Sequence, residues 1–122
     1  MKYPSKDEKI ELMGKRCLIS GSLYRDIQDK KHNPKVTWIH SPFKKCIKYP
    51  KYEPYKKEGW IIGFGFVFDG VICSGYYGES NYFKHSVRKN VVFVRLTPDG
   101  KIIKVLPKYV SLVKENNVLK NK

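Results

Sequence analysis

Cysteine is scarce in this chain of 122 residues, and long apolar runs are missing. The three cysteines, Cys17, Cys46 and Cys73, are odd in number and widely spaced, which is not the pattern of a disulfide framework. No apolar stretch approaches the roughly 18 residues of a membrane span, and the charged N-terminal segment lacks the apolar region of a secretory signal. We therefore expect a soluble, cytoplasmic protein with reduced cysteines and no membrane association.

Acidic residues are also few. Eleven aspartates and glutamates stand against 25 lysines and arginines, and the formal net charge is +14. A magnitude of about 2 to 8 keeps a small domain in solution, so this excess favours a surface that binds a polyanion. The alternative is a lysine-rich surface that reflects biased codon usage and faces only water.

Arginine makes up little of this positive charge. Only four arginines are present, and arginine is the residue that reads guanine edges and clamps phosphates with two hydrogen bonds. If nucleic acid is the ligand, we expect contacts to its backbone to dominate and sequence preference to be weak.

Motifs for catalysis and for metal binding are missing as well. His85 and Ser86 are adjacent in the sequence, but a catalytic triad is defined by three-dimensional geometry. Gly63 and Gly65 have neither the spacing nor the following helix of a phosphate-binding loop. No C-x-x-C or H-x-x-x-H pair of metal ligands occurs. The candidate ligands, His32, His40 and Cys46, are widely spaced. We expect no enzymatic activity, no cofactor and no metal.

The local patterns predict one short helix and a series of short strands. An S-x-x-E capping box, Ser5 to Glu8, predicts a helix within residues 5–13, and Gly14 can end it in a left-handed conformation. Turn motifs are Asp69-Gly70 and 97–100. The predicted strands are 14–20, 59–68, 71–77, 91–96, 101–106 and 110–114, with a short β-favouring run at 36–39 and loops at 22–35 and 78–90.

The strand predicted at residues 59–68 is the most apolar. Its large side chains alternate with period two, which predicts that Trp60, Phe64 and Phe66 lie on a buried face together with Ile62 and Phe68. Two glycines on the opposite face indicate a strand that coils sharply or is approached closely by another group. A small barrel has both properties.

The segment 30–57 carries most of the charge. It contains nine lysines and one acid, Glu53, with aromatic residues interleaved and four prolines that keep it extended. Rings that stack on bases, set among lysines that bind phosphates, predict a platform for single-stranded nucleic acid. Alternatively, the rings pack this insertion onto the barrel while the lysines stay in water. The predicted nucleic-acid or partner-binding residues are Lys30, Lys31, Lys35, Trp38, Lys44, Lys45, Lys48, Tyr49, Lys51, Tyr52, Tyr55, Lys56, Lys57, Arg88 and Lys89.

The C-terminal half resembles an SH3-like (Src-homology-type) small barrel. The hairpin VVFVRLTPDGKIIKV followed by Leu106-Pro107-Lys108-Tyr109-Val110 is similar to that family's distal hairpin, 3₁₀ turn and closing strand. The resemblance covers roughly residues 59–114. It offers Tyr24, Trp60, Pro107 and Tyr109 as counterparts of the family's peptide-contacting residues. Trp60 stands alone, however, where the peptide-binding members have two tryptophans. This departure argues against recognition of proline-rich peptides.

Together these patterns predict a mainly β, single-domain protein: a small antiparallel SH3-like barrel with a short N-terminal helix and a long basic loop insertion. We expect the helix at 5–13, the barrel at 14–114 with the insertion at 30–57, and a frayed tail at 115–122. The favoured function is nucleic-acid binding, single-stranded or structure-selective. The alternative, by analogy of size and composition, is a phage or mobile-element inhibitor or adaptor, such as an anti-CRISPR or other anti-defence protein, whose basic face binds an acidic surface of a host protein that handles nucleic acid.

Overall fold

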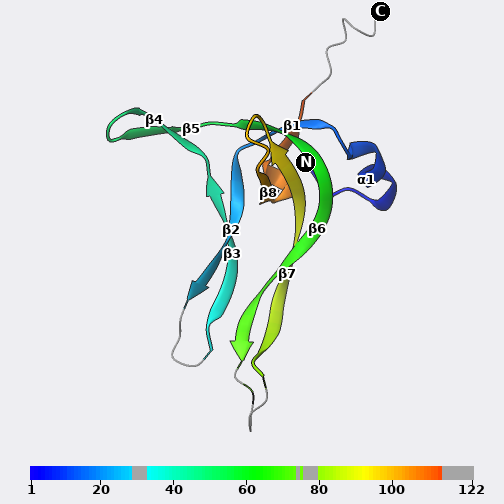
Figure 1. Ribbon diagram of the computed structural model, residues 1–122, viewed down its shortest axis with the longest axis vertical. Helices are drawn as coiled ribbons and strands as arrows, with labels where there is room; N and C mark the ends of the chain where they lie inside the picture. Colours follow the sequence, from blue (N-terminus) through cyan, green and yellow to red (C-terminus); the bar gives the residue numbers. More distant parts are fainter. Residues whose placement is uncertain (29–32, 74, 76–79, 114–122) are drawn as a thin grey trace, which may run out of the picture.

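The chain folds mainly into antiparallel β-strands, as the sequence predicts (Figure 1). The computed structural model describes residues 1–28, 33–73, 75 and 80–113. Within these residues the elements are α1 (Lys6–Leu12), β1 (Arg16–Ile19), β2 (Gly21–Gln28), β3 (Lys35–Pro42), β4 (Lys44–Lys48), β5 (Lys51–Pro54), β6 (Lys57–Cys73), β7 (Tyr82–Leu96), β8 (Ile102–Val105), the 3₁₀ turn η1 (Pro107–Tyr109) and β9 (Val110–Leu112).

The short helix begins where the capping box predicts. The Ser5 hydroxyl accepts a hydrogen bond from the Glu8 backbone N–H at 3.4 Å, and the Glu8 carboxylate accepts one from the Ser5 N–H at 3.2 Å. Gly14 follows the helix with φ of +80°, the left-handed conformation expected of it. With seven residues, α1 is too short to cross a membrane, and no other helix among the described residues could do so.

The long strand β6 joins the two halves of the barrel. Its first residues pair with β1, which in turn pairs with β9, and nearly its whole length pairs with β7. β7 pairs with β8, and β2 lies close to β8. The hairpin at residues 91–105, the 3₁₀ turn and the closing strand therefore occur where the resemblance implies, and Gly100 in the connecting turn has φ of +74°.

Two apolar clusters hold the barrel together. The larger cluster is built from alternating residues of the paired strands: Cys17, Ile19, Ile61, Val92, Val94, Leu96, Val105 and Val110. The smaller cluster consists of Leu23, Val67 and Val91, with Trp38, Phe93 and Leu106 packed against it. This smaller cluster connects the barrel to the β2–β3 hairpin.

The predicted buried face of β6 is wrong in part. Trp60 and Phe66 are 39% and 49% exposed, whereas Phe64 packs against the larger cluster. A bulge explains Trp60: Ile61 pairs with Val94 but Gly63 pairs with Phe93, so one extra residue places Trp60 on the face opposite Phe64. Phe66 follows the bulge on the same face as Phe64, but it lies opposite Asn90, beyond the larger cluster. The glycines do admit a close neighbour, because a Cβ on Gly65 would lie 2.7 Å from the Phe93 ring.

Three predicted boundaries are also wrong. Asp69-Gly70 does not turn the chain, because β6 continues through it with a second bulge, and residues 71–73 extend β6 rather than forming a returning strand. Residues 22–28 form most of β2, and residues 82–90 form the first part of β7, where loops were expected. The predicted frayed tail at 115–122 lies outside the described residues.

Candidate functional site: a basic ribbon and a neighbouring groove

The basic segment is built from strands rather than from a loop. β4 and β5 pair as a separate two-stranded sheet that projects from the barrel (Figure 1). Every residue of both strands is exposed, including Ile47 and Tyr52, and Tyr49 in the turn is 84% exposed. We call residues 44–54 the ribbon.

Lysines dominate the ribbon. Lys45 lies opposite Glu53, the ribbon's one acid, whereas Lys48 lies directly opposite Lys51 beside the turn. Like charges directly opposite each other destabilise a strand pair. Within the described residues none of the ribbon lysines forms an ion pair, so their positive charge is directed to solvent.

A small aromatic cluster anchors the base of the ribbon. The Phe43 and Tyr55 rings lie with centroids 5.8 Å apart, and the Tyr55 N–H donates to the Phe43 carbonyl at 3.2 Å. The Lys57 ammonium lies 4.5 Å from the centre of the Phe43 ring. Phe43 also contacts the larger core cluster. Tyr55 and Lys57 therefore have a structural role in joining the ribbon to the barrel.

Trp38 of β3 is held by a charged clamp. The backbone N–H of Trp38 donates to Oδ1 of Asp69 at 2.9 Å. The backbone carbonyl of Trp38 accepts from the Lys89 ammonium at 2.7 Å. Lys89 and Asp69 themselves form an ion pair at 2.8 Å. Among the described residues β3 pairs directly with β6 at Lys35 and Val36 alone. At Trp38 the side chains of Asp69 and Lys89 therefore take the hydrogen bonds that a neighbouring strand would otherwise make.

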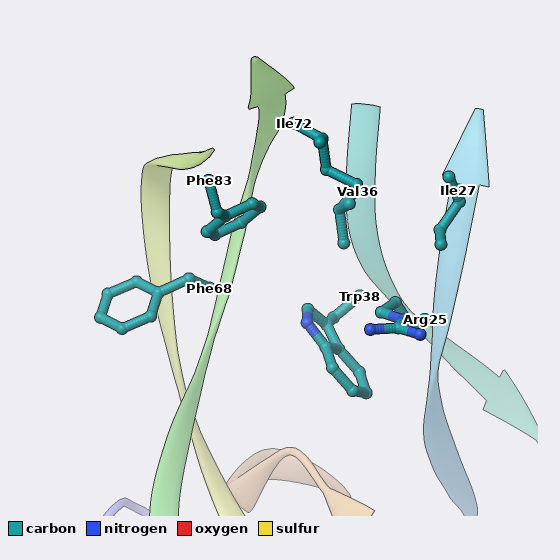
Figure 2. Close-up of a pocket in the computed structure, with 7 residues that line it drawn as sticks. All are labelled: Arg25, Ile27, Val36, Trp38, Phe68, Ile72 and Phe83. Carbon is teal, nitrogen blue, oxygen red and sulfur yellow. The ribbon is translucent and has the colours of Figure 1, made fainter. Parts of the chain in front are cut away.

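A groove of about 380 Å³ opens beside Trp38, between the β2–β3 hairpin and the outer ends of β6 and β7. Figure 2 shows the Trp38 indole with Arg25 beside it, across from the rings of Phe68 and Phe83. The described lining residues are Arg25, Ile27, Val36, Trp38, Phe68, Ile72 and Phe83. The groove therefore combines aromatic and aliphatic walls with one cation, and none of these residues is acidic.

The structure brings only some of the predicted site residues together. Lys44, Lys45, Lys48, Tyr49, Lys51 and Tyr52 share the ribbon, Tyr55, Lys56 and Lys57 lie at its base, and Lys35 and Trp38 lie on β3. Arg88 and Lys89 lie on β7 apart from the ribbon, where Arg88 covers the Phe66 ring at 4.1 Å and Lys89 belongs to the clamp (Figure 1). Lys30 and Lys31 lie outside the described residues.

Sequence reasoning missed the partners of Trp38 in the groove. Arg25 and Ile27 fell in a segment expected to be a loop, and Phe83 fell in another. A period-two pattern could have indicated them, because Arg25 pairs with Trp38 and Ile27 pairs with Val36 on one face of the hairpin. The counterparts offered by the resemblance do not gather here, since Trp60 lies opposite Arg16 at the far end of β6.

Two titratable side chains of the barrel, Cys17 and His40, have shifted pKa values. Burial, with a smaller effect of Glu58, raises the pKa of the Cys17 thiol to about 11, so this thiol stays protonated near neutral pH. His40 stacks on Tyr109 with ring centres 3.5 Å apart. Burial and the neighbouring Lys108 lower the pKa of His40. Among the described residues no group of three or more metal-ligating side chains occurs.

Comparisons of the chain with protein-family models, with curated proteins and with solved structures found no match.

Proposed function

We propose that this protein binds nucleic acid through the ribbon, mainly by contacts between lysines and backbone phosphates. The observation that carries the proposal is the projecting two-stranded ribbon, which is exposed along its length and rich in unpaired lysines. In the part of the chain that the structure describes, Glu53 is the one acid opposite a ribbon lysine, so a polyanion is the ligand that best compensates this positive charge. The proposal keeps the cytoplasmic location that the sequence predicts.

The shape of the ribbon supports the same ligand. A two-stranded β-ribbon fits the major groove of a duplex, about 12 Å wide, and can equally follow a single strand. Lysine is a mobile point charge that does not read base edges with a fixed geometry. The proposal therefore includes weak sequence preference.

The ionic strength of the solution provides the first test. For a site that contacts phosphates, log affinity falls linearly with log salt, with a slope of about −0.7 per phosphate on single strands and about −0.9 on duplex. Replacing Lys44, Lys45 and Lys48 by glutamine should reduce the magnitude of this slope by about 2 to 3 and weaken binding to every sequence similarly. Affinity is measured by fluorescence anisotropy of a labelled oligonucleotide across a salt series.

A matched variant controls for net charge. Replacing Lys2, Lys6 and Lys101 by glutamine removes the same number of charges from exposed positions outside the ribbon. This variant should keep most of the affinity and slope of the unmodified protein. Equal losses in the two variants would show that only the total charge matters. Binding to an acidic polypeptide such as polyglutamate, without binding to any oligonucleotide, would favour the inhibitor alternative instead.

A further inference from the structure

We propose that the groove beside Trp38 binds an unpaired base of a nucleic-acid strand whose phosphates lie along the ribbon. This inference rests on the proposed function and names its substrate class: nucleic acid with single-stranded character. The groove would supply stacking, and the ribbon would supply charge.

The groove offers a stacking surface that is already in place. The charged clamp of Asp69 and Lys89 fixes the Trp38 backbone on both sides, and the indole packs against the smaller core cluster. Phe83 contributes a second ring that is 43% exposed. A rigid aromatic surface loses little entropy on binding, so each stacked base should strengthen binding about 5- to 150-fold.

The electrostatics of the groove favour an anionic strand. Arg25 lines it, and the Lys104 ammonium lies 5.3 Å from the centre of the Trp38 ring. Asp69 is the acid that contacts Trp38, and Lys89 compensates its charge. A planar uncharged base can stack on the Trp38 indole while its phosphate lies near the Arg25 guanidinium. The groove volume also lies within the range of about 300 to 1,000 Å³ that small ligands occupy.

A short length of chain links the groove to the ribbon. Trp38 precedes Lys44 by six residues along β3 and into β4. Six residues of extended chain reach at most about 20 Å, and roughly six stacked nucleotides span this length at about 3.4 Å each. One short single strand can therefore reach both the groove and the ribbon.

The test uses Trp38 as its own reporter. In a Trp60→Phe variant, Trp38 is the remaining tryptophan, and Trp60 itself belongs neither to the groove lining nor to the ribbon. An oligothymidylate of about 12 nucleotides should quench its fluorescence, because a stacked base contacts the indole. An abasic oligomer of equal length carries the same phosphates but no base. It should leave the fluorescence unchanged and bind about 5- to 150-fold more weakly.

Variants of the groove give a second readout. Phe83→Leu should weaken binding of oligothymidylate about 5-fold or more and leave both the melting temperature and the binding of the abasic oligomer unchanged. Tyr24→Leu is the matched control, because Tyr24 is 47% exposed on β2 next to Arg25 and does not line the groove. It should change neither affinity.

The outcomes separate the two proposals. Quenching by oligothymidylate alone, with loss in Phe83→Leu alone, supports the groove as a base-binding site. Equal affinity for the two oligomers without quenching overturns this inference and leaves binding through the ribbon standing. Absence of binding to either oligomer and to duplex overturns both proposals.

Discussion

The barrel and the ribbon are made of the same antiparallel pairing, but different forces hold them. Residues such as Ile61 and Val94 in the barrel are fully buried, whereas every residue of β4 and β5 is exposed. Burial of a large aliphatic side chain contributes about 1.5 to 3 kcal/mol, and the ribbon has no such contribution along its strands. Packing therefore explains why apolar residues occupy the core positions of the barrel, but it does not explain why lysines occupy the ribbon.

The ribbon even carries a cost that the barrel avoids. An isolated two-stranded hairpin is at best marginally stable in water, and Lys48 faces Lys51 across the strands. Contacts at its base, where Phe43 and Tyr55 meet, hold it to the barrel. We therefore expect the ribbon to gain order when an anion neutralises the opposed lysines.

The largest expected effect separates two isoleucines, one in each region. Ile61→Ala should lower the free energy of unfolding by about 2 to 5 kcal/mol, because it opens a cavity in the larger core cluster. Ile47→Ala in the ribbon, where the side chain is 55% exposed, should change it by less than about 0.5 kcal/mol. Chemical denaturation measures both. A similar loss in the two variants would mean that the ribbon packs against something in solution.

A smaller effect depends on pH at the junction of the two regions, where His40 of β3 stacks on Tyr109. Burial, and then Lys108, lowers the pKa of His40 below its ordinary value of 6.5. As the pH falls through 6.5 the unfolded chain takes up a proton that the folded chain does not, so stability is lost below about pH 6.5 until the folded pKa is reached. Among the described residues Nδ1 of His40 has no hydrogen-bond partner, and a proton there would find no acceptor.

Replacement of His40 by glutamine tests this dependence. The variant does not titrate in this range, so its free energy of unfolding should change less between pH 7.5 and about 5.5 than that of the unmodified protein. The comparison uses the slope with pH, so it holds even if the variant is less stable throughout. Identical slopes would assign the pH dependence to other groups.

Local patterns predicted the features of the fold that depend on neighbouring residues. The capping box at Ser5, the left-handed Gly14 and the turn at residues 97–100 all occur as expected, because each is determined by a few adjacent side chains. The Asp69-Gly70 turn failed for a nonlocal reason: the long partner strand β7 continues the ladder past it, and the mismatch becomes a bulge. The exposure of Trp60, on the face opposite Phe64, follows from the other bulge.

The candidate site was predictable only where it is contiguous. The ribbon lies within one basic segment, so its lysines and Tyr52 could be named from the sequence. The groove brings Arg25 and Phe83 together from strands 58 residues apart in the chain, through pairings that no local pattern contains. Trp38 was named because it falls in the basic segment, but its clamp by Asp69 and Lys89 depends on the tertiary fold.

The smallest expected effect is the protection of the ribbon's own amides. Hydrogen exchange reports local opening free energies, which range from near zero at weakly held segments up to the global value in the core. In the free protein, amides at residues 45–53 should exchange with opening free energies near zero, because the strands there are exposed. The amides of Val92 and Val94 should exchange with opening free energies near the global value, because these residues lie in the larger core cluster. Addition of an oligonucleotide should slow exchange in the ribbon, since ligand binding stabilises the bound form. If the ribbon amides are as protected as the barrel amides before any ligand is added, contacts other than pairing hold the ribbon, and the difference between the two regions is smaller than their burial indicates.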